Sequence, residues 1–315
     1  MTDPATQAAV PEAIASGTRP SRVATLLRGS LRWLGVVPFG VYIALGLIAP
    51  TIAIAVASFQ NSGGGFVQAP SGFTWSNIDT ALHGTYLLGL KTSILLSIAT
   101  AIVPGIFGLL IAYAIYTAKR GNLLRQVVIT ASGVFANFGG VPLAFLFIAT
   151  LSTTGIVTGW IKDVFGVDIW DHGFTLYNAT GVFFVYMYFQ IPLMVLVILP
   201  ALEGLKPAWR EAAQNMGAGT WQYWRYVGGP VLLPSFLGCL LLLFGSALSA
   251  YATAEAMTSG TIPLTSIQIG SFLNGNVLAG QQNVGKALGL GLVIIIAVAM
   301  VLYTLLQRRA ARWLQ

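Results

Sequence analysis

Long apolar stretches with almost no charge constrain this 315-residue chain more than any other feature. Charged residues make up 8% of the sequence, whereas a soluble globular domain carries about 25%. A helix needs about 20 apolar residues to cross the hydrocarbon of a membrane, and six segments reach that length. We therefore predict an all-α integral membrane protein with six transmembrane helices, at 33–58, 87–117, 127–150, 176–201, 231–254 and 285–306.

The basic residues are distributed unevenly around these segments. With six spans, thirteen of the sixteen Lys and Arg residues lie in the N-terminal segment, the second-to-third loop, the fourth-to-fifth loop and the C-terminus. The positive-inside rule then places both termini and these loops in the cytoplasm. We expect residues 1–32 to form a cytoplasmic tail and an interfacial helix, and residues 307–315 to form a basic cytoplasmic tail.

The fourth-to-fifth loop, residues 202–229, is a polar insert in an otherwise apolar protein. Pro207 is suited to the first turn of a helix, where a missing N–H is not needed. Ala212 and Ala213 give this helix a slim face that another protein can approach closely. Gly217 is placed to end it, because glycine readily adopts the left-handed backbone found at helix C-termini.

A second short helix is predicted after this turn. Thr220 can cap its N-terminus. The Gly228–Pro230 run is expected to stop it and to turn the chain into the fifth span. Two short helices joined by a sharp turn and tied to a span would transmit a push from a soluble partner.

The residues of this loop resemble the cytoplasmic loop of the inner-membrane permease subunits of bacterial binding-protein-dependent ABC importers. That family's pattern is Glu-Ala-Ala, three variable residues and Gly, and then a longer stretch that ends in an aliphatic residue, any residue, Leu and Pro. Gly229 departs from it, because Leu usually precedes the proline, and Trp224 stands where Phe is common. The resemblance implies that this loop contacts an ATPase through Glu211, Ala212, Ala213, Gly217, Ala218, Trp224, Val227 and Pro230.

The resemblance extends over residues 87–306 and implies the five-helix core of a type I importer permease, with 33–58 as an added N-terminal helix. It also implies a non-enzymatic subunit of a bacterial inner membrane, surrounded by lipid and not binding nucleic acid. Its expected partners are a cytoplasmic ABC ATPase dimer, a paralogous second permease forming a heterodimer, and an extracytoplasmic binding protein.

We expect no cofactor in this chain, because the partner ATPase would bind the ATP and magnesium. The segment 280–287 nearly matches a phosphate-binding loop. It lacks the Ser or Thr that holds magnesium, and it follows no predicted strand. No set of metal ligands is apparent in the spans.

Four polar residues in or near the spans are candidates for the solute pathway: Asn137, Gln190, Tyr251 and Glu255. Polar groups at membrane depth are costly and often functional. Asn137 and Gln190 either line the pathway or hydrogen-bond between helices. Tyr251 and Glu255 could meet a cation by charge and cation–π contact, or could form a gate or a solvated helix end.

The solute is the least constrained property. The segments Ile267–Phe272 and Gly285–Leu288 resemble the spermidine/putrescine permease subgroup, although Asn283–Val284 stands where that subgroup has Trp-Pro. This resemblance implies a polyamine or related organic cation; phosphonate, ferric iron, sulfate-type anions and sugars remain as alternatives. A secondary transporter is a further alternative, but the sequence shows no internal repeat of the kind many such transporters have.

Overall fold

The computed structural model describes residues 37–61, 72–118, 123–171, 173–275 and 281–312. The tail and interfacial helix predicted at 1–32 lie outside these residues. The described part is helical apart from turns, extended connections and one isolated β-bridge between Gln60 and Phe73. The prediction of an all-α protein is therefore confirmed. The chain divides into two units, residues 1–53 and 54–315, and each is described by itself.

The first unit contains α2 (Val37–Ile43), the π-helix η1 (Ala44–Ile48) and the beginning of α3 (Ala49–Ser58). Most of its apolar side chains are exposed, as suits a helix surrounded by lipid. The π-helix ends two residues before Pro50. A proline ring clashes with the carbonyl four residues earlier in an α-helix, here that of Gly46, and the wider π turn relieves this contact.

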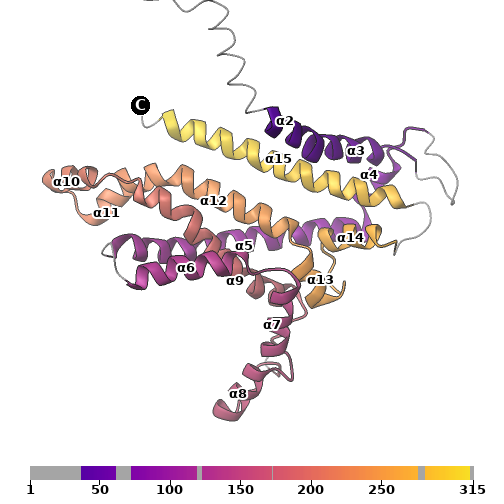
Figure 1. Ribbon diagram of the computed structural model, residues 1–315, viewed down its shortest axis with the longest axis horizontal. Coiled ribbons are helices and arrows are strands. Elements are labelled where there is room, and N and C mark those ends of the chain that lie inside the picture. Colours follow the sequence, from indigo (N-terminus) through magenta and orange to yellow (C-terminus); the bar gives the residue numbers. More distant parts are fainter. Residues whose placement is uncertain (1–36, 62–71, 119–122, 172, 276–280, 313–315) are drawn as a thin grey trace, which may run out of the picture. The chain divides into compact units, whose positions relative to one another are not determined.

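The second unit is a bundle in which long helices run side by side (Figure 1). Helix α9 (Ala179–Glu203) contacts α5 (Gly84–Thr117), α6 (Leu123–Asn137) and α12 (Gly229–Ser249). Helix α15 (Gln282–Arg312) packs along α12. The short helices α10 and α11 lie at one end of this bundle, the α10 end, and α14 lies toward the other, the α14 end (Figure 1).

Small residues let these helices approach each other closely. A Cβ atom at Gly108 of α5 would lie 2.5 Å from Cβ of Met194 on α9. One at Gly105 would lie 2.4 Å from a methyl carbon of Leu240 on α12. Helices in membranes associate through such close packing, because lipid tails are as apolar as leucine. Glycine at these two positions therefore sets the spacing of α5, α9 and α12.

The third predicted span, 127–150, is not one helix. Helix α6 ends at Asn137, Gly140 adopts a φ of +74°, and α7 (Val141–Leu151) begins directly after it. Pro142 lies in the first turn of α7, where proline is favoured. Helices α7 and α8 (Ile156–Phe165) then extend away from the long helices (Figure 1). The prediction of an unbroken helix was wrong because a left-handed glycine followed by a helix-starting proline divides the segment.

The fifth predicted span, 231–254, also ends early. Helix α12 stops at Ser249, and Ala250 has a ψ of 108°. The chain then forms α13 (Ala252–Thr258), which begins inside the predicted span, and α14 (Thr265–Leu273), which lies in the segment expected to be a loop. The carbonyl of Ala250 accepts hydrogen bonds from side chains of other elements, so it needs no helical partner.

In the described part of the chain, six helical segments are long and apolar enough to cross a membrane. The number agrees with the prediction, but the third candidate begins at α7, because α6 has only 15 residues. The candidates are Val37–Ser58, Gly84–Thr117, Val141–Phe165, Ala179–Glu203, Thr220–Ser249 and Gln282–Arg308.

Two asparagines join elements at the α14 end. The Nδ2 atom of Asn77, in α4 (Ser76–Ala81), donates to the carbonyls of Ser58 (3.0 Å) and Gln60 (2.8 Å). Asn283 Nδ2 donates to the same Gln60 carbonyl at 2.8 Å. The end of α3, helix α4 and the start of α15 are therefore tied together by buried amide groups.

Candidate coupling surface and solute pathway

The connection between α9 and α12 begins with α10 (Pro207–Asn215), and one side of this helix is fixed on the bundle. Pro207 occupies the first turn, as predicted. Ala213 is 3% exposed, and the half-buried Trp209 packs against the hydrophobic cluster at this end of the bundle. Lys206 Nζ lies 5.9 Å from the centre of the Trp209 ring.

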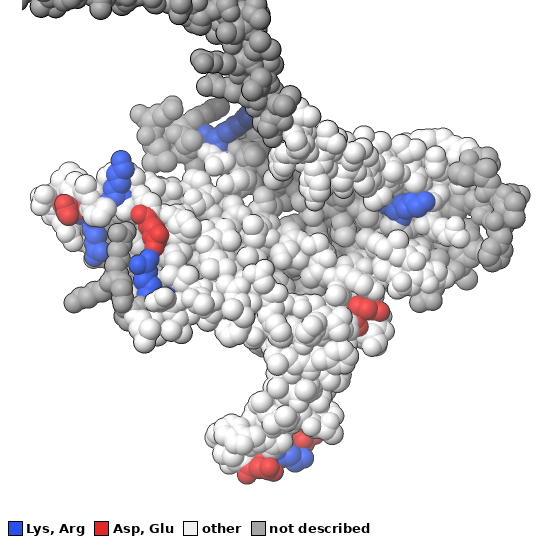
Figure 2. Space-filling view, viewed as in Figure 1, with Lys and Arg blue, Asp and Glu red and all other residues white. Residues whose placement is uncertain are grey.

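The opposite side of α10 is open. Glu211 and Ala212 are exposed. At 3.6 residues per turn, Glu211 projects roughly 160° away from Ala213. Figure 2 shows that charged side chains gather at the end of the bundle that carries α10 and α11, whereas its length shows few. The exposed side of α10 is thus the polar face that a soluble partner could contact.

Gly217 forms the turn that the sequence predicts. Its φ is +80°, and its N–H donates to the carbonyl of Gln214 at 2.9 Å. The N–H of Ala218 donates to the carbonyl of Ala213, also at 2.9 Å. This pair of bonds around a left-handed residue is the Schellman ending of a helix. A residue with a side chain would strain this backbone, so the sharp turn after α10 depends on glycine.

The second helix of the loop differs from the prediction. Gly219, not Thr220, is the N-cap of α11 (Thr220–Tyr223), and its N–H donates to Gln222 Oε1 at 2.8 Å. The run Gly228–Pro230 does not stop the helix, because α11 continues through the π-helix η2 (Trp224–Gly228) into α12. As in η1, the π turn ends two residues before a proline, and it accommodates the Pro230 ring. The loop and the fifth span therefore form one helical rod.

Trp224 faces the bundle and not the open side of the loop. Its ring contacts Tyr113 of α5 edge-on, with centroids 5.3 Å apart. A Cβ atom at Gly228 would lie 2.9 Å from the Trp224 ring, so glycine is needed for this ring position. Trp224 thus anchors the start of the rod on α5.

The eight predicted coupling residues fall into two groups. The exposed ones are Glu211, Ala212 and Gly217. The buried or half-buried ones, which shape the loop from inside, are Ala213, Ala218, Trp224, Val227 and Pro230. A direct contact with an ATPase stays a prediction for all eight.

Near the α14 end, the interruptions of the third and fifth predicted spans are bonded to each other. Thr253 Oγ1 accepts from the N–H of Gly140 at 2.9 Å and lies 3.2 Å from the Gly140 carbonyl oxygen. Tyr186 donates its hydroxyl to the carbonyl of Ala250 at 3.0 Å, and Ser266 donates to the same carbonyl at 3.2 Å. Irregular backbone in a membrane protein persists where protein buries it or where it lines a cavity. We call this set of five residues the joint.

Two predicted pathway residues lie beside the joint. The Tyr251 ring packs on Gly270 of α14, where a Cβ atom would approach it to 2.4 Å. Glu255 is half-buried in α13, and its Oε2 atom is buried without a hydrogen-bond partner among the described residues. An unpaired carboxylate oxygen in such a place is costly, and it suits a site that a cation or a donor group enters.

The other two predicted pathway residues have different surroundings. Gln190 is 0% exposed in the middle of α9, and neither its Oε1 nor its Nε2 has a partner in the described part of the chain. Asn137 is exposed at the end of α6 and donates to the carbonyl of Gly133 in the same helix at 2.9 Å. Of these two amides, Gln190 is the one that is buried without a hydrogen-bond partner among the described residues.

Sequence reasoning missed the joint. Gly139, Gly140 and Pro142 are a local signal for a helix break that lay inside a long apolar run. Tyr186, Thr253 and Ser266 carry no such signal, because their importance comes from contacts between distant segments. Among the described residues, no group of three His, Cys, Asp or Glu side chains could hold a metal ion.

The described residues thus form a helical bundle with a polar projection at one end and interrupted helices near the other. Residues 104–315 match the family described as binding-protein-dependent transport system inner membrane component. The chain belongs to this family, and it is a multi-pass membrane protein. The predicted permease class is confirmed.

Named relatives agree on the class and differ in the solute. The chain is 23% identical over 255 residues to the probable sulfate transport system permease protein cysT of Nephroselmis olivacea, covering 80% of this chain and 81% of the relative. It is 23% identical over 223 residues to the thiamine transport system permease protein ThiP of Salmonella typhimurium, covering 70% of this chain and 39% of ThiP. The chain thus spans about two fifths of the second relative.

A solved structure shares the fold. A chain of the bacterial alginate ABC transporter, crystallised in complex with an alginate pentasaccharide-bound periplasmic protein, superimposes with a TM-score of 0.71 at 18% identity. The match covers 90% of this chain and 96% of that chain. At this identity the likeness concerns the fold alone. Neither relative is described as a polyamine permease, so the polyamine prediction stays a prediction.

Proposed function

We propose that this chain forms one half of an ATP-driven import pathway and that a cytoplasmic ABC ATPase dimer moves it through α10. The observation that carries the proposal is the continuous rod from α11 through η2 to the end of α12. A displacement applied to the exposed face of α10 is passed through the Gly217 turn to this rod. Helix α10 and the rod are both anchored on the bundle, so the push is not absorbed by a flexible loop.

The far end of the rod is the joint. Helix α12 ends at Ser249, and the carbonyl of the next residue, Ala250, accepts hydrogen bonds from Tyr186 and Ser266. Movement of α12 would therefore strain these hydrogen bonds. Through α13 it would also strain the hydrogen bond between Thr253 and Gly140. We propose that the joint closes the pathway toward the outside and opens when the ATPase subunits close.

Orientation follows from charge. Four described basic residues, Arg125, Lys206, Arg210 and Arg225, belong to the α10 end, and by the positive-inside rule we propose that this end faces the cytoplasm. The α14 end then faces an extracytoplasmic binding protein. A second permease, which we propose to be a paralogue that forms a heterodimer with this chain, would complete the pathway.

For the solute we propose a small organic cation, such as a polyamine. The unpaired carboxylate oxygen of Glu255 beside the joint supports a cation, and Tyr251 adds an aromatic face. ThiP, a named relative, is described as a thiamine permease. A sulfate-type anion is the second candidate, because the other named relative is described as a probable sulfate permease.

The coupling proposal is tested by purifying the tagged chain from its host membranes in mild detergent. We expect an ABC ATPase, a second permease chain and ATP hydrolysis to accompany it, and Glu211→Lys to remove most of the ATPase. Asp163→Lys, a charge reversal at the exposed surface of α8, controls for folding and membrane insertion. Full retention of the ATPase by Glu211→Lys contradicts the proposed contact. Solute uptake by the intact complex without ATP would instead favour a secondary transporter.

The solute proposal is tested on the binding protein and the complex. Thermal shifts of the binding protein are measured with spermidine, putrescine, thiamine, sulfate, a phosphonate, ferric iron and a sugar. We expect stabilisation by a cation, and a loss of uptake of about tenfold or more in Glu255→Gln, since a hydrogen bond to a charged group contributes about 1.5–3 kcal/mol. Stabilisation of the binding protein by sulfate, with undiminished uptake in Glu255→Gln, would contradict the cation and support a sulfate-type anion as the solute.

A further inference from the structure

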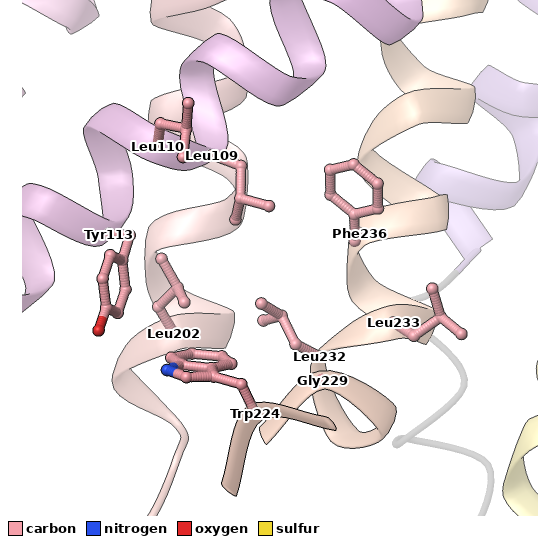
Figure 3. A pocket seen from close by; sticks show the side chains of 9 residues that line it. All are labelled: Leu109, Leu110, Tyr113, Leu202, Trp224, Gly229, Leu232, Leu233 and Phe236. Carbon is pink, nitrogen blue, oxygen red and sulfur yellow. The ribbon is translucent and has the colours of Figure 1, made fainter. Parts of the chain in front are cut away.

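Two cavities of different character meet at the α10 end. The first is an apolar crevice of about 370 Å³ between α5, α9 and α12, shown in Figure 3. Its floor includes the buried Leu202 and Leu232, whereas Leu110 and Leu233 at its edge are largely exposed. The crevice is therefore open toward the outside of the bundle, and its apolar lining would suit lipid tails there.

The second cavity is polar and has a similar volume of about 370 Å³. Lys206 and Arg210 line it, together with Glu211 and Gln214 of α10. Tyr113 and Trp224 line both cavities, so the two spaces adjoin across this aromatic pair. In Figure 3 the rings of Tyr113 and Trp224 lie toward one side of the crevice with Leu202 between them, and Phe236 and Leu233 lie on the opposite side.

This order of surfaces matches a phospholipid. Tyrosine and tryptophan are enriched where the hydrocarbon meets the head groups, because their rings are apolar and their tips are polar. An acyl chain suits the leucine-lined crevice below this level, and a phosphodiester suits the lysine and arginine above it. Basic pockets between transmembrane helices on the cytoplasmic side are known binding places for anionic head groups.

We propose that one anionic phospholipid with a hydroxyl-bearing head group, of the phosphatidylglycerol type, occupies the two cavities. One acyl chain fills the crevice, and the phosphate contacts Lys206 and Arg210. Glu211 and Gln214 also line the polar cavity, and their oxygen atoms can accept hydrogen bonds from head-group hydroxyls. The bound lipid fills the space between α10, α5 and the rod, and so stiffens the connection through which α10 acts.

The inference depends on the proposed orientation, because anionic lipids face α10 only if this end is cytoplasmic. It is tested on the purified complex by native mass spectrometry, without nucleotide or solute, so that it does not depend on transport. Phosphatidylglycerol, phosphatidylethanolamine and phosphatidylcholine are titrated separately. We expect one phosphatidylglycerol to be retained per copy of this chain, and the other two lipids to be retained at least tenfold less.

Two pairs of variants locate the site. Each basic side chain near an anionic lipid contributes about fivefold in affinity, so Lys206→Gln with Arg210→Gln should weaken retention about 25-fold. Arg225→Gln, an exposed basic residue of η2 outside both cavities, should change it less than twofold. Leu233→Trp should block the crevice and so reduce lipid retention. Leu242→Trp should leave retention unchanged, because Leu242 does not line the crevice. The two leucines are a matched pair, since both lie on α12 and are exposed to 47% and 45%.

Other occupants give different results. Competition by glycerol phosphate as strong as that by the lipid would assign the site to a free phosphate and overturn the proposal. Release of the second permease by Leu233→Trp, with lipid retention unchanged, would show that a protein covers the crevice. Equal retention of all three lipids would also overturn the proposal of an anionic phospholipid. None of these results bears on whether the ATPase co-purifies, so the two proposals can fail separately.

Discussion

Thr253→Val tests whether the joint holds α13 against the start of α7. Thr253 is 4% exposed, and its hydroxyl provides both bonds to Gly140, at 2.9 and 3.2 Å. Valine has nearly the same shape as threonine and carries a methyl group in place of the hydroxyl, so the substitution leaves no cavity. The N–H of Gly140 then loses its acceptor.

The expected cost follows from these two bonds. Hydrogen bonds between helices in a membrane contribute about 0.6 kcal/mol on average and up to about 1.7 kcal/mol. A donor left unsatisfied costs about 1–3 kcal/mol. We therefore expect a loss of about 1–3 kcal/mol, which lowers the Tm of a 315-residue protein by about 1.5–4.5 °C.

The chain contains its own reporter for this measurement. Cys239 is the single cysteine of the sequence, and it is 4% exposed in α12. A dye that fluoresces on reaction with thiols will therefore report when the bundle opens on heating. Thr258→Val is the matched control, because Thr258 is buried in the same helix and donates only to Ala254 within it. An equal Tm for both variants would refute the argument that the joint holds these segments together.

Three further predictions use the same purified protein. Gly108→Ala should lower the Tm by several degrees, because its Cβ would lie 2.5 Å from Met194, whereas Gly133→Ala, with open space around it, should not. Gly217→Ala should cost about 1 kcal/mol of helix-end stability and reduce ATP-driven uptake, measured against unchanged membrane insertion. Gln190→Leu should raise the Tm, because it removes two unpaired polar atoms, and should reduce uptake if the buried amide contacts solute in another conformation; an unchanged or lower Tm would contradict the first part.

Local signals in the sequence predicted the elements that depend on local physics. The apolar runs gave helices because backbone groups in lipid must bond within their own segment. Pro207 and Gly217 predicted both limits of α10, since the preferences of proline and glycine are properties of the residue itself. The predicted slim face of Ala212 and Ala213 was right only for the exposed Ala212, because Ala213 packs against the bundle.

Contacts between distant segments decided the rest. The break at Ala250 has no local cause, because its carbonyl is satisfied by Tyr186, 64 residues earlier in the chain. One wrong prediction had a local cause instead: the helix does not stop after α11, because a π turn accommodates Pro230. Asn137 and Gln190 looked equivalent as single amides in apolar runs, and only the packing of α6 and α9 exposed one and buried the other.

The position of Gln190 connects the packing of the bundle to its proposed motion. One hydrophobic cluster contains Met194 and another contains Phe189, so Gln190 lies where the two meet along α9. Close-packed clusters keep their shape, and a change of conformation is therefore easiest at such a boundary. Two unpaired polar atoms there raise the free energy of this conformation by about 1–3 kcal/mol relative to one that lets water or solute reach them. Conformations of a working transporter differ by a few kcal/mol, so this one amide is enough to bias their populations.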